Sequence, residues 1–176
     1  MKIQTAHFGE RDIDESTVIT FNGGLPGFDQ KTRFALLPEE VDPPVFYFLQ
    51  SIEDPDLAFT VSFSEKFGIT FDESVLTTDE MASLGLAKYD DAVVILLISE
   101  NREHPHRRQF DPKFVPHISH PLVINPQTRK GIYKALNGVR CSATVSATAE
   151  PGDDGQGARE DYLRFLAMMQ AGITAS

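Results

Sequence analysis

Residues 21–28 read Phe21-Asn22-Gly23-Gly24-Leu25-Pro26-Gly27-Phe28. Pro26 fixes φ near −65° and Gly27 tolerates a positive φ, which are the requirements of the two central positions of a type II turn. Leu25 and Phe28 flank the turn. Side chains this apolar are expected to be covered, either by the chain's own β core or by a partner. The stretch therefore predicts a tight reversal that sets the register of the segments before and after it.

Short β-strand patterns dominate the chain on both sides of this turn. Runs of β-branched and aromatic residues between turn signals predict strands at Ile3–Phe8, Ser16–Phe21, Arg33–Leu37, Val45–Ser51, Leu57–Phe63, Gly68–Phe71, Ala92–Ser99 and Pro121–Asn125. Asn137-Gly138 predicts a two-residue hairpin between Gly131–Leu136 and Val139–Thr148. So many short strands predict an all-β fold, a small antiparallel β-barrel or sandwich-like domain.

Two helices are expected beside these strands. Thr77 followed by Glu80 is a capping-box pattern and predicts one short internal helix over Thr78–Leu86. Near the end of the chain, a Gly- and Asp-rich linker over 150–157 precedes a predicted amphipathic helix, Arg159–Ala171, whose apolar positions are Tyr162, Phe165, Leu166 and Met169. We therefore expect one domain over 1–148, with an irregular basic insertion at about 100–116, followed by a linker and C-terminal helix over 149–176.

Composition and charge restrict the class of protein. The 176 residues suffice for one domain with a sizeable core, and no apolar run approaches the ~20 residues of a membrane span. A single cysteine, Cys141, and the lack of a signal-peptide pattern predict a cytoplasmic location. The net charge is −10, with −13 over residues 1–100 and +6 over 101–141. The acidic body disfavours direct binding to nucleic acid.

The sequence contains no pattern that predicts a catalytic or metal-binding site. The chain has no phosphate-binding glycine motif, nucleophile elbow or His-Glu-x-x-His pattern, so we expect neither enzymatic activity nor a cofactor. Four histidines, His104, His106, His117 and His120, have spacings that could bind Zn²⁺. Neighbouring arginines oppose a cation there and no cysteine is close, so no metal site is predicted. A nucleic-acid-binding basic loop or a metal-binding loop is left as the alternative function.

Several motifs follow one another along residues 3–140: Phe8-Gly9-Glu10, Ile13-Asp14-Glu15-Ser16, Ile19-Thr20-Phe21, Gly24-Leu25-Pro26-Gly27-Phe28, the segment Leu49–Phe59, and Pro121-Leu122-Val123-Ile124-Asn125. In this order and spacing they resemble one known family, that of flagellar assembly factor W (FliW). The chain differs from the family pattern at the insertion over 101–116, at His117-Ile118-Ser119-His120, and in the tail beyond about residue 149.

The resemblance implies a compact β-barrel-like protein without enzymatic activity and with two protein partners. These are flagellin and the RNA-binding translational repressor CsrA. It further implies a partner switch, in which the free factor relieves CsrA repression of flagellin mRNA and also acts as a flagellin chaperone. We expect a protein that is monomeric alone and makes no contact with membranes. The candidate partner-binding or structural motif comprises Gly24, Leu25, Pro26, Gly27, Phe28, Leu49, Gln50, Ser51, Asp54, Pro55, Leu57, Pro121 and Asn125.

Overall fold

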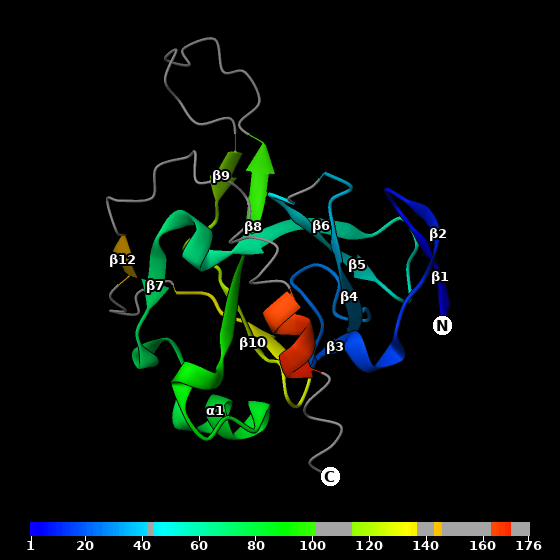
Figure 1. Cartoon of the computed structure of the whole chain (residues 1–176). Coiled ribbons are helices and arrows are strands. Elements are labelled where there is room, and N and C mark those ends of the chain that lie inside the picture. Colours follow the sequence, from blue (N-terminus) through cyan, green and yellow to red (C-terminus); the bar gives the residue numbers. More distant parts are fainter. Residues whose placement is uncertain (42–43, 101–113, 137–142, 146–162, 170–176) are drawn as a thin grey trace, which may run out of the picture.

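The structure is a computed structural model that describes residues 1–41, 44–100, 114–136, 143–145 and 163–169 (Figure 1). Seven of its strands form a closed barrel, in the order β10-β11-β3-β4-β5-β6-β8, and β8 pairs back onto β10. The bounds of these strands are β3 (Val18–Phe21), β4 (Arg33–Pro38), β5 (Tyr47–Ser51), β6 (Ala58–Phe63), β8 (Val93–Glu100), β10 (Leu122–Asn125) and β11 (Lys130–Tyr133). The predicted all-β barrel is confirmed.

One pair in the barrel departs from the predicted antiparallel arrangement. β3 and β11 run parallel, with Gly131 opposite Phe21, whereas the other neighbours are antiparallel. Seven strands cannot alternate in direction all the way around a closed ring, so an odd-numbered barrel requires at least one parallel pair. The glycine at 131 suits this pair, because a Cβ there would lie 2.5 Å from the ring of Phe21.

The remaining elements cover the outside of the barrel. They are β1 (Lys2–Thr5), β2 (Gly9–Asp12), β7 (Ile69–Phe71), β9 (Phe114–Pro116), β12 (Ala143–Val145), α1 (Thr78–Leu84) and four 3₁₀ turns at Glu15–Thr17, Ser64–Phe67, Glu73–Val75 and Tyr89–Asp91. The capping box predicted for Thr77 and Glu80 is present, and α1 ends at Gly85 in the left-handed conformation. No helix among the described residues is long and apolar enough to cross a membrane.

Alternation along the strands divides the core into an inner and two outer clusters. Inward residues such as Ile19, Phe34 and Leu49 fill the barrel. Val123 and Leu96 point outward and are covered by α1, β7 and the 3₁₀ turns, while Val18 and Ala35 are covered by the β1–β2 hairpin. β8 and β10 are buried on both faces, which explains why their sequences are continuously apolar.

Three local predictions need correction. The hairpin around Asn137-Gly138 is wrong in its pairing, because β12 pairs with β7 while β10 and β3 occupy both edges of β11; the dipeptide itself lies outside the described residues. The strand predicted over Ile3–Phe8 ends at Thr5, and Gly9 begins β2. Phe114–Pro116, expected to be irregular, forms β9 against β8.

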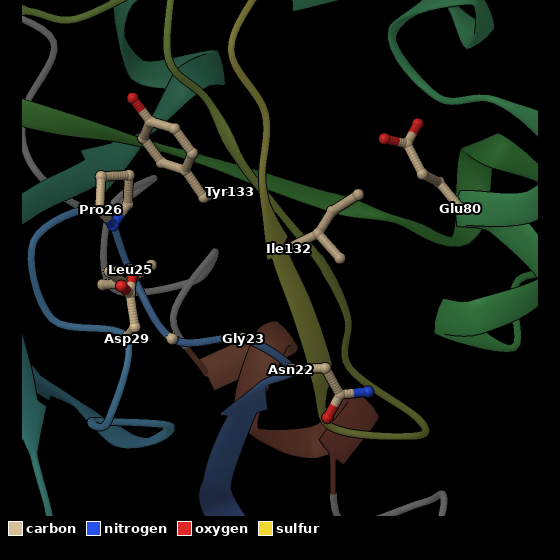
Figure 2. A pocket seen from close by; sticks show the side chains of 9 residues that line it. Asn22, Gly23, Leu25, Pro26, Asp29, Glu80, Ile132 and Tyr133 are labelled. Atoms are coloured by element: carbon tan, nitrogen blue, oxygen red, sulfur yellow. The ribbon is translucent and has the colours of Figure 1, made fainter.

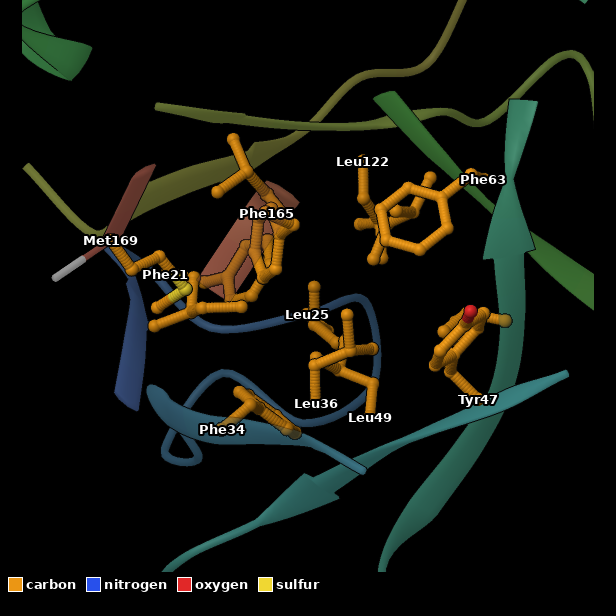
Figure 3. Packing of buried hydrophobic residues seen from close by; sticks show 14 residues of the cluster. Phe21, Leu25, Phe34, Leu36, Tyr47, Leu49, Phe63, Leu122, Phe165 and Met169 are labelled. Carbon is orange, nitrogen blue, oxygen red and sulfur yellow. The ribbon is translucent and has the colours of Figure 1, made fainter. Parts of the chain in front are cut away.

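The C-terminal helix is confirmed over residues 163–169, and the predicted linker and Tyr162 lie outside the described residues. Figure 3 shows Phe165 and Met169 of this helix together with barrel residues such as Phe21 and Leu122. The helix thus contributes side chains to the interior cluster, although it is far from the barrel strands in sequence.

Candidate partner-binding surface

The turn at Leu25–Phe28 has the predicted geometry. The Phe28 amide donates to the Leu25 carbonyl at 2.7 Å, and Gly27 has φ +82°, as the third residue of a type II turn requires. Gly24, with φ +70°, lies against the returning chain, where a Cβ would be 2.5 Å from the Phe28 carbonyl oxygen. The type II turn is therefore confirmed, and position 24 requires glycine.

The two apolar residues of the turn have different environments. Leu25 is 3% exposed and packs inside the barrel, whereas Phe28 keeps 38% of its surface exposed. The chain's own core therefore covers Leu25 almost completely and Phe28 only in part. A large aromatic side chain at the surface is the kind of group that anchors a partner.

A row of aromatic rings connects Phe28 to the interior of the barrel. Phe28 meets the ring of Phe59 edge-on at a centroid distance of 5.5 Å. Phe59 lies 6.3 Å from Phe34, which in turn packs edge-on against Phe21 at 5.7 Å. Such pairs are individually favourable, so the exposed ring of Phe28 is supported by packed aromatic rings as well as by its own turn.

The loop over 51–57 lies beside the turn. The Ser51 hydroxyl accepts hydrogen bonds from the amides of Glu53 and Asp54, both at 3.2 Å, which shapes the loop locally. The loop is joined to the chain after the turn by Lys31 Nζ, 3.4 Å from Asp54 Oδ2, and by the Arg33 amide, which donates to the Glu53 carboxylate at 3.2 Å. The turn and the loop therefore form one continuous surface.

We call Pro26, Gly27, Phe28, Leu57 and Phe59 the turn surface. Its aromatic and proline groups are exposed or half-buried, and exposed carboxylates at Asp29, Glu53 and Asp56 belong to the same two segments. An apolar centre with an acidic rim is suited to a protein partner whose own surface is apolar and basic.

Other residues of the predicted motif support the fold. Leu49 and Pro121 are buried, and the Gln50 amide nitrogen is within 3.0–3.3 Å of carbonyls in the 51–57 loop while its oxygen accepts from the Ala6 amide at 2.9 Å. The Asn125 amide nitrogen donates to the carbonyls of residues 84 and 85, at 3.0 and 3.1 Å, and so holds the end of α1 against the barrel. Gln50 and Asn125 thus position loops and are themselves inaccessible to a partner.

A cavity of about 320 Å³ opens beside the turn (Figure 2). Its walls come from the turn segment, from β11 and from α1, and are formed by Asn22, Gly23, Gly24, Leu25, Pro26, Asp29, Glu80, Ile132 and Tyr133. The ring of Tyr133 stacks on His120 at 5.6 Å. Two carboxylates and one aromatic ring therefore face a hollow next to the turn surface.

The two carboxylates of this cavity differ electrostatically. Partial burial acts to raise the pKa of Glu80, but hydrogen bonds from Lys134 Nζ at 2.7–2.8 Å and from the Thr77 amide at 2.8 Å hold that pKa below its ordinary value. Asp29 is exposed and makes no ion pair with another described residue. Glu80 is thus ionised and neutralised by a lysine, and Asp29 is the more available of the two for a cation on a partner.

Comparison with known proteins identifies the family of this chain. A family model described as "FliW protein" matches residues 2–146. The chain belongs to the FliW family. It is 34% identical over 151 residues to flagellar assembly factor FliW of Azoarcus sp. (strain BH72), covering 85% of this chain and all of that relative. FliW of Chromobacterium violaceum is 31% identical over 140 residues, with 76% and 92% of the two chains covered.

A solved structure supports the fold. The crystal structure of a flagellar assembly factor FliW covers 87% of this chain and 99% of its own, with a TM-score of 0.65 and 23% sequence identity. The family model and the Azoarcus relative confirm the resemblance predicted from the sequence, and membership of the FliW family supports a role in flagellar assembly. The family model ends at residue 146, before the C-terminal helix.

Sequence reasoning missed part of this FliW surface. Ile132, Tyr133 and Glu80 reach the cavity from elements more than fifty residues away from the turn, and Glu80 was expected only to cap a helix.

Of the predicted histidine cluster, His104 and His106 lie outside the described residues. His117 Nε2 lies 2.9 Å from the Ser99 hydroxyl. Within the described part of the chain, no group of three or more metal-ligating side chains occurs.

Proposed function

We propose that this FliW protein is a non-enzymatic partner-switching regulator of the cytoplasm, monomeric when alone. Its two partners are the RNA-binding repressor CsrA and flagellin. Free FliW binds CsrA and relieves repression of flagellin mRNA. Accumulating flagellin then binds FliW, which serves as its chaperone, and CsrA is released. The observation that carries the proposal is the exposed Phe28, supported by the ring of Phe59, in a member of the FliW family.

The turn surface supports a protein partner rather than a small-molecule substrate. Aromatic anchors that are exposed yet rigidly supported are typical of binding hot spots, because little conformational freedom is lost when they are buried. Phe28 fits this description, since it stands on the ring of Phe59. The acidic rim formed by Asp29, Glu53 and Asp56 suits a partner that carries basic residues.

The charge distribution supports antagonism of an RNA-binding protein. Residues 1–100 carry 19 carboxylates against 6 lysines and arginines. A body of this charge, bound to CsrA, repels the phosphates of an mRNA leader and itself has little affinity for RNA. At physiological salt we expect non-specific RNA binding by the free chain to be weaker than the ~10⁻⁴–10⁻⁶ M typical of nucleic-acid-binding proteins.

The experiment titrates flagellin into a preformed complex of this chain with CsrA, and follows both CsrA release and recovery of leader-RNA binding by CsrA. Release from mostly bound to mostly free requires an advantage of about 3 kcal/mol for flagellin in combined affinity and concentration, because each 1.4 kcal/mol is a factor of ten. A stable complex of all three proteins would contradict the switch. Failure to bind either partner would contradict the proposed function as a whole.

A pair of variants tests whether the turn surface makes the contact. Phe28→Ala removes the exposed anchor. Val45→Ala is the control: Val45 is also exposed and apolar, but it precedes β5, so it lies at the opposite end of that strand from the 51–57 loop. We expect Phe28→Ala to lower the affinity for CsrA, for flagellin or for both by tenfold or more. Val45→Ala is expected to leave both affinities unchanged. If both variants bind CsrA and flagellin with the same affinities, the interface does not include the turn surface.

A further inference from the structure

The C-terminal helix over 163–169 is fixed to the protein by one narrow face. Phe165 and Met169, four residues apart, are 1% and 0% exposed and belong to the interior cluster of the barrel. The ring of Phe165 packs edge-on against Phe63 at 5.9 Å. Leu163 is 54% exposed and Ala167 is also exposed, so the opposite face meets solvent.

The helix depends on the barrel for its stability. A helix this short is marginal in water by itself, so it forms because the barrel accepts its two buried side chains. The residues that receive the helix lie within the segment matched by the FliW family model, residues 2–146, and the helix lies outside that segment.

We propose that this part of the barrel interior is a binding site for an amphipathic helix of a partner protein, and that the chain's own 163–169 helix occupies it as an intramolecular competitor. The bound helix defines the ligand: an aromatic residue and a large unbranched apolar residue at positions i and i+4. The seven residues 163–169 include Arg164 and no carboxylate. This charge is complementary to residues 1–100, which carry a net charge of −13. The inference does not depend on which protein supplies the partner helix.

Competition from the same chain has a measurable consequence. An attached helix acts at an effective concentration on the order of mM for short linkers, so a helix supplied in solution meets a site that is mostly filled. The apparent affinity for the added helix falls in proportion to the fraction of protein whose site is free. If nine-tenths of the molecules hold their own helix, releasing it strengthens binding of an added helix about tenfold.

The test uses a fluorescent peptide of residues 159–171 and three full-length proteins. Phe165→Asp/Met169→Asp releases the helix from the barrel. Leu163→Asp/Ala167→Asp introduces the same charges at the same spacing on the exposed face and serves as the matched control. By fluorescence anisotropy, the first variant is expected to bind the peptide at least tenfold more tightly than the unmodified chain. The control is expected to bind within twofold of the unmodified chain.

Several results would overturn the proposal. A Phe165→Asp/Met169→Asp protein that melts cooperatively but does not bind the peptide, or binds it no better than the control, shows that the site cannot be filled in trans. If that variant fails to fold, hydrogen exchange on the unmodified chain tests the proposal instead. The amides of 163–169 should exchange at least a hundredfold faster than those of β8. Equal protection of the two segments would show that the helix is a permanent part of the core. A dimer by light scattering that carries the helix of a second copy would also refute the intramolecular arrangement.

Discussion

Truncating the two apolar residues of the central turn should separate stability from binding. Leu25→Ala removes a side chain that is 3% exposed in the barrel interior. Changes of this kind cost about 2–5 kcal/mol, because the lost transfer free energy is accompanied by a cavity. For a protein of this size, 3 kcal/mol corresponds to a fall in Tm of roughly 6–12 °C.

Phe28→Ala should behave differently. Its side chain is 38% exposed and has one described ring partner, Phe59, so the loss of stability comes from partial burial and a single edge-on contact. We expect about 1–2 kcal/mol, since such a ring pair contributes about 0.5–1.5 kcal/mol beyond its buried area. Loss of an interface anchor, by contrast, costs 2 kcal/mol or more in binding, about thirtyfold in Kd.

The assay combines a circular-dichroism melt with binding isotherms for CsrA and flagellin on the same preparations. Leu25→Ala is expected to lower Tm by more than Phe28→Ala while retaining both affinities at a temperature where it is folded. The reasoning fails if Phe28→Ala binds both partners like the unmodified chain. It also fails if Phe28→Ala destabilises the protein as much as Leu25→Ala, since Phe28 would then act only as a core residue.

Three further predictions concern the scaffold. Gly131→Ala should destabilise the protein by about 1–3 kcal/mol in urea unfolding, because the added methyl group would lie 2.5 Å from the buried Phe21 ring; an unchanged midpoint would show that the β3–β11 pair can relax. Asn125→Ala should cost about 1–3 kcal/mol and speed hydrogen exchange at the C-terminal end of α1, because the Gly85 carbonyl loses its amide donor and the Leu84 carbonyl keeps only the Thr128 hydroxyl. The lowered pKa of Glu80 means that its ion pair with Lys134 stabilises the fold above the ordinary value of 4.5, and that this stability is lost as pH falls through the folded pKa. The stability difference between the unmodified chain and Lys134→Met should therefore shrink as pH is lowered below 4.5, and a difference independent of pH would exclude this linkage.

Local features of the fold could be predicted from the sequence because their causes are local. The type II turn follows from Pro26-Gly27, the start of α1 follows from Thr77 and Glu80, and the strand at β8 follows from a run of apolar residues. Strand partners could not be predicted in the same way. The Asn137-Gly138 signal favours a hairpin, but pairing is decided by which strand edges remain free once a barrel closes, and this depends on distant segments.

The candidate site shows the same division. Sequence identified the turn and the 51–57 loop, and the resemblance joined them to one family. It did not distinguish Leu25, which points inward, from Phe28, which stays exposed, because the direction of each side chain is fixed by how the turn sits on the barrel. The cavity also escaped prediction, since Tyr133 and Glu80 approach the turn only through the folded arrangement of β11 and α1.

The parallel pair that closes the barrel also affects how the protein is made. β3 emerges early from the ribosome, and its edge toward β11 has no strand to pair with until Lys130 and Gly131 have been synthesised. At about 5–20 residues per second, that edge waits roughly 5–20 s for its partner. An unpaired edge is a template for joining another chain, so the nascent protein passes through an interval in which it is open to aggregation. For this chain, the speed of translation between Phe21 and Lys130 is therefore a determinant of folding yield.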